Sequence, residues 1–133
     1  MREILFRGKR IDNGKWVEGY FGKYFDGDEE VNCIALPTKE TLAGSLCYEV
    51  DPTTIGQYTG LTDKNVKNIF EGDLITIPGS KRQGLPAPVK WSNLDARFEI
   101  SRRGFNPICL DGDEGIYEVI GNIHDNPELL EGD

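Results

Sequence analysis

The sequence has few of the residues from which catalytic and metal centres are usually built. Its 133 residues include one histidine, His124, and three cysteines, Cys33, Cys47 and Cys109, which are far apart and form no CxxC pair. An odd number of separated cysteines indicates neither a disulfide framework nor a zinc site. We therefore expect reduced, mostly buried thiols and neither a bound metal nor a cofactor.

Long hydrophobic runs are also missing. Near the start only Ile4, Leu5 and Phe6 form an apolar run, which is far shorter than the core of a signal peptide. No stretch approaches the length of a membrane span. We expect a cytoplasmic protein with no membrane association.

Motifs of the common enzyme classes are absent as well. The glycines at Gly56 and Gly60 have neither the lysine nor the spacing of a P-loop. His124 is followed by Asp125, but neighbours on an extended chain point to opposite faces, so this carboxylate is poorly placed to orient the imidazole as a base. We expect no catalytic residue and no enzymatic activity. An enzyme with an unrecognised carboxylate site stays as an alternative because the chain has 23 acidic residues.

Charge is unevenly distributed along the chain. Fifteen basic and 23 acidic residues give a net charge of -8, which favours solubility and disfavours binding to nucleic acid. Residues 1–15 carry five basic and two acidic side chains, whereas residues 104–133 carry eight acidic side chains and no Lys or Arg. The acidic clusters at residues 26–30 and 111–114 lack the glycine and ligand positions of a calcium loop and are interpreted as solvated turns.

Glycine and proline, at 16 and 7 residues, separate short segments rich in β-branched and aromatic side chains. This spacing predicts strands rather than helices. Asn13 and Gly14 predict a type I′ hairpin turn, and residues 26–28 predict a second turn, which together give a three-stranded meander. Further strands are predicted at residues 46–50, 55–58, 74–77, 89–91, 96–101 and 116–123, with irregular chain at 59–70 and 80–88. Asn126 is predicted to cap a short terminal helix that begins at Pro127.

These strands carry apolar residues on both faces and need cover on two sides. We therefore predict a mainly β protein, in which an N-terminal β-meander packs with a small, SH3-like, partly open barrel and a short C-terminal helical turn follows. The chain is predicted to be one domain, 1–133, with a possible subdivision into 1–55 and 56–133. Because only 38% of the residues are hydrophobic, we also expect a homo-oligomer.

One segment interleaves cations with aromatic rings, which is the composition of grooves that bind single-stranded nucleic acid. The candidate site residues in it are Lys81, Arg82, Lys90, Trp91, Arg97, Arg102 and Arg103. The alternation of Arg97 and Glu99 with Phe98 and Ile100 instead places Phe98 in the core. Salt bridges to the acidic C-terminal region, within or between subunits, are a second interpretation of the same cations.

Four blocks of the sequence match a pattern that spans nearly the whole chain. They are MREILFRGK at 1–9, GQYTGLTDKN at 56–65, IFEGDLI at 69–75 and VIGNIHDNPELL at 119–130. In these blocks the chain resembles the YopX family of phage and prophage proteins. The resemblance implies a phage or prophage origin, a β-rich fold and self-association, and it supplies no reaction and no catalytic residue.

Together these observations lead to one expected function with alternatives. We expect a non-enzymatic, self-assembling module that binds a host or phage protein in the cytoplasm of a bacterial host. The alternatives are a β-barrel that binds single-stranded nucleic acid and the enzyme named above.

Overall fold

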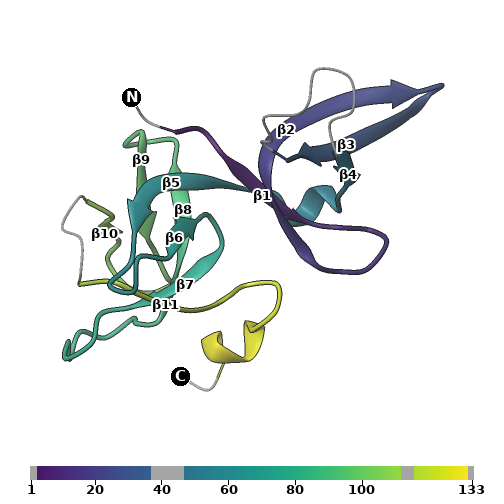
Figure 1. Ribbon diagram of the computed structural model, residues 1–133. Coiled ribbons are helices and arrows are strands. Elements are labelled where there is room, and N and C mark those ends of the chain that lie inside the picture. Colours follow the sequence, from purple (N-terminus) through teal and green to yellow (C-terminus); the bar gives the residue numbers. More distant parts are fainter. Residues whose placement is uncertain (1–2, 37–46, 112–115, 132–133) are drawn as a thin grey trace. The chain divides into compact units, whose positions relative to one another are not determined.

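The computed structural model describes residues 3–36, 47–111 and 116–131, and its described elements are strands and two short 3-10 helices (Figure 1). The expectation of a mainly β protein is confirmed. The first sheet has the strand order β4-β3-β2-β1-β5-β6 and the second has the order β10-β9-β8-β7-β11. No closed barrel is found among the described strands. The described chain also contains no helix long and apolar enough to cross a membrane.

The chain divides into two compact units, Met1–Tyr58 and Thr59–Asp133. The first unit contains β1 (Phe6–Lys9), β2 (Trp16–Asp26), β3 (Glu29–Ala35), β4 (Cys47–Glu49), the 3-10 helix η1 (Pro52–Thr54) and the start of β5 (Gly56–Thr62). The second contains the rest of β5 and β6 (Asn68–Phe70), β7 (Asp73–Thr76), β8 (Ala87–Ser92), β9 (Arg97–Ile100), β10 (Ile108–Cys109), β11 (Glu118–Asn122) and η2 (Pro127–Leu130).

The predicted meander is present, because β1 pairs with β2 and β2 with β3, both antiparallel. The second turn has two loop residues, with a φ of +67° at Gly27, as in a type II′ turn. The type I′ prediction for the first turn is wrong. Residues 10–15 separate the two strands, and of Asn13 and Gly14 only Gly14 has a positive φ. The Asn13 side chain instead accepts a hydrogen bond from the Lys15 N–H over 2.9 Å.

The core of the first unit lies on one face of its strands. Val17, Ile34 and Val50 are buried there, and Phe6, Phe21, Leu36, Tyr48 and Ile55 pack against them. Of the two cysteines in this unit, Cys33 is buried and Cys47 is exposed, and Cys109 in the second unit is exposed as well. The prediction of mostly buried thiols is therefore wrong. All three are free thiols. Exposure is tolerated at Cys47 because β4 is a short strand at the edge of its sheet.

In the second unit, the prediction of irregular chain at residues 59–70 is wrong, because two strands cover much of this range. Strand β5 continues to Thr62, and β6 begins at Asn68. Thr59 is buried, and its hydroxyl donates to the carbonyl of Ile69 over 2.8 Å. A polar residue is therefore accommodated inside a strand because a partner on the neighbouring strand satisfies its hydrogen bond. The two-residue strand β10 was also not predicted.

The core of the second unit follows the predicted alternation in β9. Phe98 and Ile100 are buried, while Arg97 and Glu99 lie on the opposite, partly exposed face. The buried cluster is formed by Ile69, Ile75, Ala87, Val89, Phe98, Ile100, Leu110 and Tyr117. Because β8 pairs with β9 in register, the outward face of this hairpin carries Lys90 opposite Glu99.

The terminal turn η2 begins at Pro127 as predicted, but its cap differs from the prediction. The Asn126 side chain makes no capping hydrogen bond. It accepts a hydrogen bond from the backbone N–H of Asn122 over 3.2 Å, which ties the turn back to the end of β11. The predicted turn at residues 111–115 lies outside the described residues, except Asp111.

Candidate functional site

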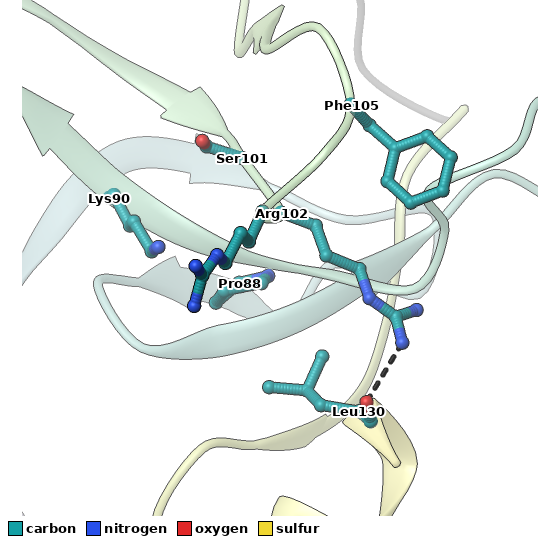
Figure 2. A pocket seen from close by; sticks show the side chains of 7 residues that line it. Pro88, Lys90, Ser101, Arg102, Phe105 and Leu130 are labelled. Atoms are coloured by element: carbon teal, nitrogen blue, oxygen red, sulfur yellow. Dashed lines mark hydrogen bonds between the residues drawn. The ribbon is translucent and has the colours of Figure 1, made fainter. Parts of the chain in front are cut away.

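The second unit has an open pocket of about 470 Å³ at the ends of β8 and β9 (Figure 2). This volume falls within the range of about 300–1,000 Å³ that is typical of ligand pockets. Its described lining residues are Pro88, Lys90, Ser101, Arg102, Arg103, Phe105 and Leu130. Three of these seven side chains are cations and none is an acid, so the pocket has the charge for a negatively charged ligand.

Local structure explains why the cations gather at this pocket. Lys90 points outward from β8, while Arg102 and Arg103 come after β9 and are separated from it by Ser101 alone. The Phe105 N–H donates to the carbonyl of Arg102 over 3.1 Å, and Gly104 has a φ of +91°, as a type II turn requires at that position. This tight turn keeps both arginines and Phe105 at the same edge of the hairpin.

Two of the three cations lack an acidic partner in the described parts of the chain. Glu99 faces Lys90 in register, but its carboxylate is 3.4 Å from Nε of Arg97. Neither Lys90 nor Arg103, both of them exposed, forms an ion pair within 4.0 Å among the described residues. Their charges therefore remain available to an incoming anion.

Arg102 has a structural role at the wall of the pocket. Its Nη2 donates to the carbonyl oxygen of Leu130 over 2.8 Å, and its Nη1 donates to the carbonyl of Pro86 over 3.4 Å. Figure 2 shows Arg102 reaching to Leu130, with Lys90 and Phe105 on either side of it in this view. The guanidinium thus holds the terminal turn η2 against the pocket and adds a positive charge to its wall.

Apolar groups form the rest of the pocket surface. Pro88 is buried and Leu130 is partly buried, whereas the Phe105 ring is 40% exposed. A cationic rim around an apolar floor is suited to a ligand that combines a negative charge with an apolar group.

The structure brings together only some of the residues predicted for a nucleic-acid groove. Lys90, Arg102 and Arg103 line the pocket, whereas Trp91, Arg97, Lys81 and Arg82 do not. Trp91 projects from the opposite face of β8 and packs edge-on against Phe98, with ring centroids 5.0 Å apart. Successive side chains on a strand point to opposite faces of the sheet. Lys90 and Trp91 are neighbours in β8, so they cannot belong to one stacking surface.

The remaining predicted cations are held elsewhere. Arg97 lies 3.4 Å from Glu99 and 3.9 Å from Asp95, so its charge is compensated within its own hairpin. Arg82 donates to the carbonyl of Asn106 over 3.2 Å, and Lys81 is exposed. The interpretation as salt bridges therefore fits Arg97, although with partners in its own segment rather than in the acidic C-terminal region.

Four lining residues, Pro88, Ser101, Phe105 and Leu130, were not among the predicted site residues, and Leu130 is the most distant of them in the sequence. It is 28 positions from Arg102, and it reaches the pocket through η2. The expected attraction between the basic segment and the acidic C-terminal region was the only signal in the sequence for such a contact. It could not identify a leucine carbonyl as the acceptor.

The other candidate positions have structural roles in the described chain. The Asp125 carboxylate accepts a hydrogen bond from the Asn122 side-chain amide over 3.1 Å, and the His124 N–H donates to the Asn122 side-chain oxygen over 2.9 Å. The described residues contain no group of three or more His, Cys, Asp or Glu side chains arranged to hold a metal ion.

Comparison with known proteins identifies a family and similar solved structures. The sequence profile of a family described as YopX protein matches residues 5–131. The fold is similar to the crystal structure of protein EF1440 from Enterococcus faecalis, with a TM-score of 0.58 and 25% sequence identity over 98% of this chain and 100% of that chain. No curated protein is significantly similar in sequence to this chain.

Proposed function

We propose, from the premise that this chain belongs to the YopX family, that it is a non-enzymatic module that binds a negatively charged segment of a partner protein. The observation that carries the proposal is the pocket in which Lys90, Arg102 and Arg103 surround an apolar floor without an acidic lining residue among those described. Convergent positive charge is unfavourable unless a ligand or solvent screens it, so an anionic ligand is favoured there.

The terminal turn of the chain itself supports a polypeptide as the ligand. The η2 residue Leu130 lies at the pocket: its side chain forms part of the wall, and its backbone carbonyl accepts a hydrogen bond from Arg102. A partner segment can offer the same two groups, an apolar side chain and a backbone carbonyl, and an acidic side chain would add the charge that the cations of the pocket attract. The overall charge of -8 still repels a long polyanion such as nucleic acid.

Fluorescence anisotropy with a labelled peptide of alternating glutamate and leucine tests the proposal. Binding should weaken about tenfold in Lys90→Ala and in Arg103→Ala, the size expected for loss of one charge-assisted contact. Lys15→Ala removes an exposed lysine of the first unit and serves as the matched control, with unchanged affinity. Failure of the peptide to bind at low salt, or equal binding by all variants, contradicts the proposal.

Single-stranded nucleic acid is the second candidate, because the exposed Phe105 ring beside Lys90 and Arg103 has the composition of a stacking site. An SH3-like, partly open barrel, the architecture predicted for the second unit, is compatible with either ligand. Oligothymidine and oligouridine in the same assay distinguish the two candidates. Binding of these probes with a steep salt dependence, in the absence of peptide binding, favours the second candidate.

We further propose that the protein self-associates. The support is the lean apolar composition of 38% and the exposed aromatic side chains of the β2–β3 hairpin, among which Phe25 is 70% exposed. Size-exclusion chromatography with light scattering should give a mass above 14.9 kDa. A monomeric mass at micromolar concentration contradicts this expectation.

A further inference from the structure

A second cavity adjoins the cationic pocket and shares two of its residues. It has a volume of about 380 Å³ and is lined by Gln83, Gly84, Leu85, Arg102 and Phe105. Arg102 and Phe105 line both cavities, so a single extended ligand can occupy both without leaving the surface.

The two cavities differ in chemistry. Lys90 and Arg103 lie only on the first, whereas the residues found only on the second, Gln83, Gly84 and Leu85, are uncharged. Beyond Arg102, the second cavity therefore offers the Phe105 ring and the Leu85 side chain as its principal surfaces. Such a lining is suited to an apolar side chain rather than to a second anion.

The wall between the cavities is held in place by close packing. Gly84 has a φ of +93°, and a Cβ atom at this position would lie 2.7 Å from Cγ of Phe105. The absence of a side chain at Gly84 thus lets the ring lie against the backbone of the loop. The ring lies against Gly84 and lines both cavities, and both cavities are present without a ligand.

We propose that the site recognises an extended peptide with a two-part motif, an acidic residue next to a large aliphatic residue. The carboxylate is bound between Lys90 and Arg103, and the aliphatic side chain enters the second cavity across the Phe105 ring. This inference rests on the proposed function and adds the identity of the second recognition element. A peptide is favoured over nucleic acid because, of the described residues that line the two cavities, only Phe105 has an aromatic ring on which a base could stack.

Three short peptides test this motif by fluorescence anisotropy. They carry glutamate with leucine, glutamate with serine, and glutamine with leucine at the two positions. The wild-type protein should bind the glutamate–leucine peptide about tenfold more tightly than either of the others, as expected for one partly buried leucine or one charge contact.

Variants assign each preference to its cavity. Gln83→Trp fills the second cavity from an exposed position, so it should abolish the preference for leucine over serine and leave the preference for glutamate over glutamine. Lys90→Ala should do the reverse. Gln83→Glu places a negative charge beside the second cavity without adding bulk and should also weaken the leucine preference, and thermal melts check that all variants fold.

The outcomes separate this inference from the proposed function. A glutamate preference without any leucine preference overturns the two-part motif and leaves the acidic-segment proposal intact. A leucine preference that persists in both Gln83 variants also overturns the motif. Absence of the glutamate preference contradicts the proposed function itself, and tighter binding of oligothymidine than of any peptide overturns both.

Discussion

The guanidinium of Arg102 donates a hydrogen bond of 2.8 Å to the carbonyl oxygen of Leu130, which joins the end of β9 to the terminal turn 28 residues later. Leu130 belongs to η2, a turn in which no residue is buried and whose Asn126 provides no side-chain cap. With so little buried surface of its own, the turn is held by this bond at its end and by the hydrogen bonds between Asn126 and Asn122 at its start.

Arg102→Ala should therefore release the terminal turn. We expect amide hydrogen exchange to accelerate at residues 127–131 while exchange in the strand cores stays unchanged. The loss of a partly exposed charged hydrogen bond should lower the free energy of unfolding by about 1 kcal/mol. Lys81→Ala removes an exposed cation of the same segment and should change neither quantity. Unchanged exchange in the Arg102 variant would show that other contacts hold the turn.

Asp63 should make the protein sensitive to acid. Burial of this carboxylate favours its neutral form, but hydrogen bonds from the backbone N–H groups of Val119, Lys67 and Asn65 outweigh that effect and lower its pKa. A group with a lowered pKa contributes stability above its unfolded pKa of about 3.9 and loses that contribution as the pH falls through its folded pKa.

The variant Asp63→Asn tests this assignment, because it removes the titrating carboxylate. The asparagine NH2 group takes the place of one carboxylate oxygen, and it cannot accept a hydrogen bond from the backbone N–H group that faces it. We expect the free energy of unfolding of the variant to be about 2 kcal/mol lower than that of the wild type at pH 7. Between pH 5 and pH 2 the variant should then lose less of its free energy of unfolding than the wild type does, by a difference on the order of 1 kcal/mol. Urea unfolding at a series of pH values measures both. A variant that keeps the full acid dependence of the wild type would assign that dependence to other carboxylates.

Gly19 should tolerate no side chain, whereas Gly22 on the same strand should. A Cβ atom at Gly19 would meet the backbone carbonyl oxygen of Ala35 and could not be accommodated by a side-chain movement. Gly22 has open space, with Sγ of Cys33 as the nearest atom at 3.8 Å. Gly19→Ala should cost about 2–3 kcal/mol, and Gly22→Ala should change stability by less than about 1 kcal/mol. Thermal unfolding compares the matched pair, and equal melting temperatures would contradict the close approach at Gly19.

The three thiols should differ in reactivity. Burial, followed by a hydrogen bond with Cys47, raises the pKa of Cys33 to about 11, while Cys47 and Cys109 are exposed. At pH 8 iodoacetamide should label two cysteines quickly and Cys33 slowly, because the thiolate is the reactive form. A raised pKa also means that the contribution of Cys33 to stability is complete below its unfolded value of about 8.5 and declines as the pH rises toward its folded value. Mass spectrometry identifies the labelled sites, and rapid labelling of Cys33 in the folded protein would contradict its burial.

Local features of the sequence were sufficient to predict the strand class and the buried face of one strand. The alternation of Arg97 and Glu99 with Phe98 and Ile100 identifies the buried face of β9, because side chains on a strand alternate with a period of two. The polar extension of β5 could not be predicted in this way. Thr59 is acceptable inside a strand only because the carbonyl of Ile69 accepts its hydroxyl, and that partner lies on another strand.

The sequence by itself determined that the chain forms short antiparallel strands joined by glycine turns, because backbone freedom and side-chain alternation are local properties. Only the tertiary structure decided which cations share a pocket. It placed Lys90 beside Arg102 and Arg103, turned Trp91 to the opposite face, and brought Leu130 to the pocket wall. These positions follow from strand register and from the path of the chain after β11, which depend on contacts between residues far apart in the sequence.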